Sequence, residues 1–135
     1  MSVEISSKVK DNVLIAEITG DSYDGGDAGV WLSIFQMAQD AGTEGILLVN
    51  HLKSSISPVS ALILNKHAQD YPVIKAIANY RINLPNAANM FVYTLMNRVA
   101  KGSGRSFRNF FSREEAEDWL QSKLKESREE NYNGR

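Results

Sequence analysis

The chain opens with two short segments of strand-like pattern separated by a polar pair. Residues 3–10 alternate between apolar and polar side chains, and residues 13–19 are mostly apolar, as expected of two strands. Asp11 and Asn12 lie between them, and both residue types tolerate the left-handed backbone angles of a tight turn. The chain is therefore predicted to begin with a β-hairpin.

After the hairpin the spacing of apolar residues becomes that of a helix, which is predicted between Asp27 and Gly42. Asp27 is a suitable N-cap for this helix and Gly42 a suitable C-terminal stop. Residues 45–50, GILLVN, form a continuous apolar run, which predicts a central strand covered on both faces. The helix has one apolar face, formed by Trp31, Ile34, Phe35 and Ala38.

Two further helix–strand units follow. Helices are predicted over residues 58–70 and 85–101, each opening on a proline, which favours the first helical position. Strands are predicted over residues 73–80 and 106–111.

The C-terminal segment has the pattern of a capped helix. Ser112 and Glu115 have the S-x-x-E spacing of a capping box, in which a hydroxyl and a carboxylate satisfy backbone N–H groups reciprocally. Trp119 is expected to bury against the sheet. The predicted buried face consists of Ala116, Trp119, Leu120 and Leu124, and the predicted outer face of Glu114, Glu115 and Asp118.

The resulting order is β-β-α-β-α-β-α-β-α. Alternating strands and helices predict a single α/β domain with a mostly parallel mixed sheet covered by helices. We place this domain at residues 1–126 and a polar tail at residues 127–135.

Composition narrows the class of protein. The chain of 135 residues has room for one core, and it contains no cysteine, which excludes disulfides, thiolate catalysis and cysteine-bound metal. The first residues lack the apolar core of a signal peptide, and no segment reaches transmembrane length. A cytoplasmic protein is therefore predicted.

Charge is unevenly distributed although the net charge is only −1. Residues 71–113 contain seven basic residues and no acidic residue. Such a segment attracts phosphate groups, lipid headgroups or an acidic partner. The alternative is that these residues neutralise acidic parts of the same domain. The overall pI of about 6.1 argues against nucleic-acid binding.

Three stretches carry a resemblance to a known family: FRNFFSREEAEDWL, KAIANY and PNAANMFVYTLMNRVAKGSGR. They resemble the closing strand and acidic helix, a Lys-Ala strand and the third helix of the STAS domain (sulphate transporter and anti-sigma-factor antagonist). The likeness is strongest to its SpoIIAA-like branch, whose fold is related to that of CRAL-TRIO lipid-binding domains. The resemblance implies a SpoIIAA-like fold and a regulatory or binding role without enzymatic activity.

One region departs from the family pattern. Regulatory STAS proteins are switched by phosphorylation of a serine in an Asp-Ser-Ser-Gly-like turn. The matching stretch here is HLKSSISPVSAL, in which Pro58 occupies the turn and no Asp or Gly accompanies the serines. Ser57 is better explained as an N-cap, so the kinase switch is not carried over.

The C-terminal ends of the parallel strands gather the polar residues most suited to chemistry. Ligands usually bind at this edge, where Asn50, His51 and Arg81 are expected to lie. The alternative function is a small hydrolase or transferase, in which His51 serves as base for a serine such as Ser54, with Asp24 orienting the base. No G-x-S-x-G elbow supports this alternative.

No motif for a metal or a cofactor was found, and none is predicted. Asp21, Asp24 and Asp27 have a spacing that fits neither a calcium loop nor a zinc site. The glycine-bearing loop around them also lacks the spacing of a phosphate loop.

The helix predicted over residues 85–101 has an unusual outer face. Met90 and Tyr93 fall among its polar positions, and Arg98 and Lys101 add a basic flank. This surface is predicted to mediate a homodimer, or to bind a protein partner or a small apolar or anionic, lipid-like ligand, including peripheral contact with a membrane. The sequence thus predicts a STAS-like binding module.

Overall fold

The computed structural model describes residues 4–20, 27–51, 66–67, 70–81, 105–110 and 112–133. These residues form one five-stranded sheet in the order β1-β2-β3-β4-β5. The first pair of strands is antiparallel and the other three pairs are parallel. The predicted α/β fold with a mostly parallel mixed sheet is confirmed. The strands are β1 (Glu4–Lys10), β2 (Val13–Thr19), β3 (Gly45–Asn50), β4 (Ala76–Arg81) and β5 (Ser106–Phe110), and the helices are α1 (Asp27–Ala41) and α4 (Arg113–Asn133).

The opening hairpin turns at the predicted pair of residues. Asp11 and Asn12 have φ angles of 52° and 66°, and Lys10 pairs with Val13 across the turn. Two consecutive residues with positive φ define a type I′ turn, whose twist matches that of the strands beside it. The local sequence therefore determines both the turn and the register of β1 against β2.

Helix α1 ends at the predicted glycine. Gly42 has a φ of 71°, and its N–H donates to the carbonyl of Gln39 at 3.1 Å. The N–H of Thr43 donates to the carbonyl of Ala38 at 3.0 Å. This is the hydrogen-bond pattern of a Schellman motif, which caps the last carbonyls of a helix.

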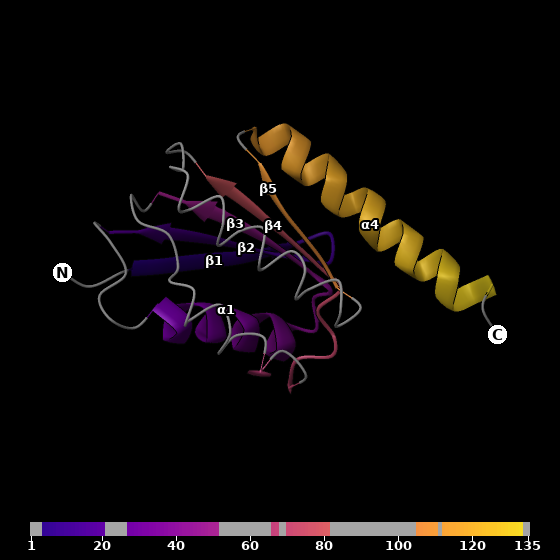
Figure 1. Ribbon diagram of the computed structural model, residues 1–135, viewed down its shortest axis with the longest axis horizontal. Coiled ribbons are helices and arrows are strands. Elements are labelled where there is room, and N and C mark those ends of the chain that lie inside the picture. Colours follow the sequence, from indigo (N-terminus) through magenta and orange to yellow (C-terminus); the bar gives the residue numbers. More distant parts are fainter. Residues whose placement is uncertain are drawn as a thin grey trace.

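The two helices cover opposite faces of the sheet (Figure 1). We call these the α1 face and the α4 face. Side chains of a strand alternate between the two faces of the sheet. Strand β3 is buried along its whole length because both faces are covered, as predicted. The α1 face carries the larger core, in which Trp31, Phe35 and Phe107 form aromatic contacts with centroid distances of 6.1–6.3 Å.

The α4 face is packed by the C-terminal helix. Ala116, Leu120 and Leu124 are buried there, as predicted, and the N–H of Glu115 donates to Ser112 Oγ at 3.4 Å, which is one half of the predicted capping box. Trp119 differs from the prediction because it is only partly buried. It packs against Phe110 of β5 at 5.5 Å, and β5 is the edge strand of the sheet formed by the described residues.

Helix α4 continues to Asn133, well into the segment 127–135 that was predicted to be a tail. Glu, Lys and Arg are good helix formers, so a polar composition does not end a helix by itself. Residues 66–67 are helical, within the helix predicted over residues 58–70. The helix predicted over residues 85–101 lies outside the described residues. Among the described helices, none is long and apolar enough to cross a membrane.

Candidate binding groove

A groove runs along the α4 face between helix α4 and the hairpin. Helix α4 lies against β3, β4 and β5, which leaves β1 and β2 beside it (Figure 1). Two adjoining hollows of about 210 and 220 Å³ occupy this space, and Ile15 lines both. We call them together the α4 groove. Its apolar floor consists of Val13, Ile15, Leu47 and Val49.

The walls of the α4 groove follow from the periods of a strand and a helix. Ser6, Lys8 and Lys10 are alternate residues of β1, so their side chains lie on one face of the sheet. The opposite wall consists of Arg113, Glu117 and Gln121, which recur every four residues and so share one side of α4. Four residues of strand span about 13 Å and eight of helix about 12 Å, so the two walls have equal length.

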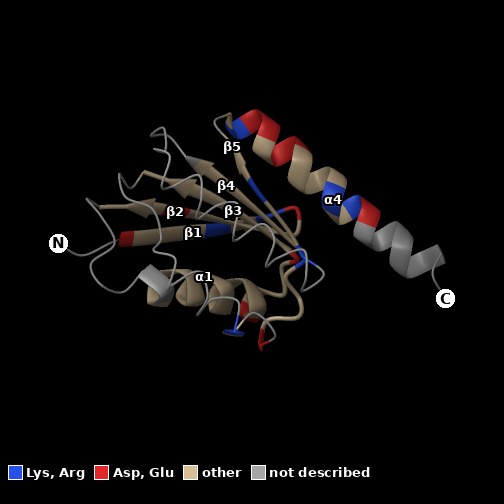
Figure 2. Cartoon of the chain, viewed as in Figure 1, with Lys and Arg blue, Asp and Glu red and all other residues tan. Residues whose placement is uncertain are grey.

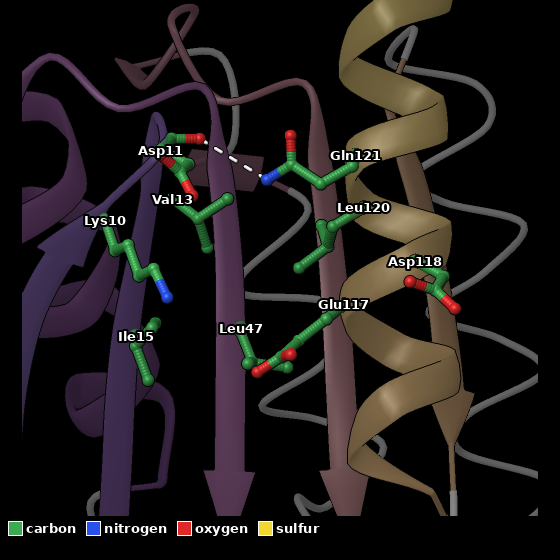
Figure 3. Close-up of a pocket in the computed structure, with 9 residues that line it drawn as sticks. All are labelled: Lys10, Asp11, Val13, Ile15, Leu47, Glu117, Asp118, Leu120 and Gln121. Carbon is green, nitrogen blue, oxygen red and sulfur yellow. Dashed lines mark hydrogen bonds between the residues drawn. The ribbon is translucent and has the colours of Figure 1, made fainter.

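The charges in the groove are partly paired. Arg113 Nε lies 3.0 Å from Glu117 Oε1, an i,i+4 ion pair within the helical wall. Gln121 Nε2 donates to the carbonyl of Asp11 at 3.4 Å and so links helix and hairpin (Figure 3). Lys8 and Lys10 form no salt bridge with any side chain in the described part of the chain. The β1 wall therefore contributes two basic side chains, with the acidic residues Asp11 and Glu17 lining the groove next to them.

His51 and Glu17 form a pair at the C-terminal end of β2 and β3. Nε2 of His51 lies 2.6 Å from Oε2 of Glu17, and the two side chains are 34% and 48% exposed. Glu17 lines the groove on the α4 face, so the imidazole is on that side of the sheet. Ser6 pairs with Glu17 across β1 and β2, which places the carboxylate between the hydroxyl and the imidazole. A catalytic serine needs its base adjacent, so Ser6 and His51 do not have the geometry of a nucleophile and its base.

Three asparagine side chains form a ladder on the α1 face. Asn50 Nδ2 donates to Asn79 Oδ1 at 3.5 Å, and Asn79 Nδ2 donates to Asn109 Oδ1 at 2.9 Å. Asn50 and Asn79 are buried, at 1% and 0% exposed. The ladder crosses β3, β4 and β5 near their C-terminal ends. Buried amides need partners, so each carboxamide satisfies its neighbour and the aromatic core ends in a polar layer.

The structure separates the residues that the sequence grouped at this edge. Asn50 is buried on the α1 face, whereas His51 contacts Glu17 on the α4 face. Arg81 is the last residue of β4 and pairs with Asn50 in the sheet register, but its side chain is not among those described. The other predicted site and catalytic residues lie outside the described residues: Met90, Tyr93, Arg98, Lys101, Ser54 and Asp24. Within the described residues, no three His, Asp or Glu side chains cluster as metal ligands.

Part of the basic segment has a structural role. Arg105 is 9% exposed, and its guanidinium donates to the carbonyl oxygens of Tyr71 and Ile74. Burial lowers the pKa of the Arg105 guanidinium, because desolvation disfavours its charged form. Arg108 lies over the ring of Phe110, 5.2 Å from its centroid. Some of the basic residues in the segment 71–113 therefore have partners within the same domain.

Sequence reasoning missed Glu17, Lys8 and Lys10 as site residues. Each carried a signal: Glu17 is the only charged residue of VLIAEIT, and the two lysines alternate along β1. What the sequence lacked was the position of α4, which makes one face of the hairpin into a wall of the groove.

Comparison with known proteins shows which solved structures have a similar fold. No protein-family model matches the sequence, and no curated protein matches it. The structure is similar to an anti-sigma factor antagonist from Mycobacterium paratuberculosis, with a TM-score of 0.52 and 13% sequence identity over 89% of this chain and 95% of that chain. It is also similar to an uncharacterized protein with a SpoIIAA-like fold from Shewanella loihica, with a TM-score of 0.46 and 16% identity over 87% and 93% of the two chains. The chain has a SpoIIAA-like, STAS-like fold, as the sequence resemblance implied.

Proposed function

We propose that the protein is a non-enzymatic regulatory module that binds a protein partner through the α4 groove. The shared fold supports this role, because the similar protein from Mycobacterium paratuberculosis is described as an antagonist of another protein, an anti-sigma factor. The α4 groove supplies independent support, because it is observed in this chain and does not depend on the comparison with another protein.

The shape of the groove carries the proposal. Its hollows of about 210 and 220 Å³ are open and lie side by side. Sites for small molecules usually bury most of their ligand, which an open groove does not do. A shallow groove with charged walls suits a polypeptide surface better, because reversible protein interfaces are polar at the rim and use charge to select the partner.

The position of the groove favours a helical segment as the occupant. Helix α4 has its main contacts with β4, and β2 lies two strands away. Two strand spacings amount to about 10 Å, which is also the usual distance between packed helices. A partner helix could therefore lie beside α4 over β2, with an apolar side chain on Ile15. Lys8 and Lys10 would select carboxylates on that helix.

Site-specific crosslinking tests this proposal. A photoreactive residue at Gln121, on the groove wall, is expected to capture one defined partner in cells of the source organism. The matched control is the same residue at Ser122, which is also exposed but lies about 100° around the helix. Equal capture from both positions, or capture from neither, would contradict the proposal.

Charge substitutions then test the chemistry of the partner. Gln121→Lys is expected to strengthen binding of the captured protein and Gln121→Glu to weaken it, each by about three- to tenfold. Ser122→Lys and Ser122→Glu are the controls and should leave the dissociation constant unchanged. If both charges at position 121 have the same effect, the partner segment is not acidic.

A second surface rests on the sequence pattern alone. Met90 and Tyr93, with Arg98 and Lys101 as a basic flank, support binding of a small apolar or anionic ligand or self-association. Native mass spectrometry of Met90→Ser with Tyr93→Ser tests this surface. Unchanged ligand content and oligomeric state in that variant would exclude it.

The absence of serine catalysis is likewise part of the proposal. Its support is that Glu17 occupies His51 Nε2 at 2.6 Å and that Ser6 lies beyond the carboxylate. Labelling by a fluorophosphonate probe that is lost in His51→Ala would instead favour the hydrolase alternative.

A further inference from the structure

Strand β1 lies at one edge of the sheet. It is the first strand in the sheet order, and β2 is its only partner among the residues that the structure describes. Six of its seven residues are exposed and the seventh, Ile5, is partly buried. Val9 is the large apolar side chain that stays exposed in the described part of the chain, at 54%. An edge strand of this kind is a template for pairing with another strand.

The turn determines which backbone groups of β1 point outward. In a type I′ hairpin the residues that flank the turn, here Lys10 and Val13, are hydrogen-bonded to each other. Hydrogen-bonded pairs then alternate with non-hydrogen-bonded pairs along an antiparallel ladder. The N–H and C=O groups of Ile5, Ser7 and Val9 therefore point away from β2, towards this edge of the sheet.

The sequence of β1, EISSKVK, is complementary to itself when it is reversed. In an antiparallel pair centred on Ser7, Glu4 lies opposite Lys10 and Ile5 lies opposite Val9. Each of these pairs occurs twice because of the twofold symmetry. The outward-pointing residues also pair only with each other, since Ile5 meets Val9 and Ser7 meets Ser7. The backbone pattern and the side-chain pattern thus select the same register.

We propose that β1 pairs with β1 of a second copy of this chain, in antiparallel orientation about Ser7. This joins the two sheets into one continuous sheet. Lysines on an edge strand normally deter pairing. Here each copy places Glu4 opposite the partner's Lys10. The lysine that deters pairing with other strands therefore favours pairing with a second β1.

Neighbouring registers satisfy fewer residues. A shift of two positions in one direction places Lys8 opposite Lys8, which is repulsive. A shift of two in the other direction places Glu4 opposite Lys8 but leaves Ile5 opposite Ser7, and Val9 and Lys10 extend past the partner's strand. The register centred on Ser7 pairs all seven residues.

Charge reversal and its rescue test this interface. Sedimentation velocity is expected to show a concentration-dependent dimer for the wild type. Lys10→Glu and Glu4→Lys each place like charges opposite one another twice, and each should weaken the dimer by at least about tenfold. The double variant Glu4→Lys with Lys10→Glu restores opposite charges and should restore the wild-type dissociation constant. Circular dichroism checks that all variants fold.

Cysteine crosslinking tests the register. The chain contains no cysteine, so Ser7→Cys introduces a single thiol at the symmetry axis. Facing Cα atoms in a hydrogen-bonded pair lie about 5.5 Å apart, which is within the range for a disulfide. Ser7→Cys should form a disulfide dimer under mild oxidation. Ser6→Cys should not, because its symmetry mate lies two positions along the strand.

The results separate this proposal from the proposed function. Glu4 does not line the α4 groove, so Glu4→Lys should weaken the dimer and leave partner capture from Gln121 intact. A wild-type monomer at all concentrations overturns the dimer, whatever the groove binds. A dimer that survives both single reversals also overturns it. If Met90→Ser with Tyr93→Ser then dissociates that dimer, self-association uses the other surface.

Discussion

The two tryptophans of the chain lie on opposite faces of the same sheet, and their surroundings differ. Trp31 of α1 is 1% exposed and contacts the rings of Phe35 and Phe107. Trp119 of α4 is partly buried and contacts Phe110 near the edge of the sheet. The α1 face is thus a closed aromatic core, whereas the α4 face is packed at its centre and open beside the hairpin.

From this difference we predict that stability depends mainly on the α1 face, and the proposed binding uses the α4 face. A closed core contributes most to the free energy of unfolding, since buried apolar side chains cannot be truncated without leaving a cavity. Figure 2 shows basic residues on β1, and Lys8 and Lys10 form no salt bridge with another described residue. Exposed charges of this kind contribute little to stability. Substitutions on the two faces should therefore have separable effects on stability and on binding.

The largest effect is expected from Trp31→Ala. Removal of a fully buried indole should lower the free energy of unfolding by about 3–5 kcal/mol. Chemical denaturation followed by circular dichroism measures the change. A loss below about 1 kcal/mol would mean that the α1 face is not the main core.

A smaller loss is expected from Asn79→Ala in the asparagine ladder. The side chain at its centre bonds both Asn50 and Asn109, and truncation leaves buried amide groups unsatisfied. The expected cost is about 1–3 kcal/mol. Asn109→Ala removes only the partly buried end of the ladder and is the control. Equal stability of the two variants and the wild type would show that the ladder does not contribute.

Trp119→Ala should cost about 2 kcal/mol, less than the same substitution at Trp31, because part of the indole already contacts solvent. Leu120→Ala, at the adjacent and fully buried position, is the matched comparison and should cost about 2–5 kcal/mol. If Trp119→Ala destabilises the protein as much as Trp31→Ala does, the two faces are equally closed.

The smallest effect on stability is expected from Ile15→Thr on the floor of the α4 groove. Ile15 is only partly buried, and threonine keeps the β-branched shape that suits a strand, so the cost should be about 1 kcal/mol or less. Its effect should appear instead as weaker binding of the crosslinked partner. A large loss of stability without any change in binding would assign Ile15 to the core.

Local patterns predicted much of the fold. Asp11-Asn12, Gly42 and the continuous run of β3 each predicted a feature that the structure contains, because turn, cap and strand signals act over a few residues. The candidate site was less predictable. His51 was identified from its residue type and its place after a strand, but its partner Glu17 lies 34 residues earlier. Only the parallel pairing of β2 with β3 brings the two side chains together.

The sequence by itself determined the described strands and the two described helices α1 and α4, their order and most of the apolar sides of these helices, because periodicity and capping depend on neighbouring residues. It also determined the self-complementary pattern of β1, which is written in seven consecutive residues. The tertiary structure decided which residues share a face. The position of α4 over β3, β4 and β5 makes a groove beside the hairpin and leaves Trp119 partly exposed. These outcomes depend on contacts between segments far apart in the chain, and no local pattern encodes such contacts.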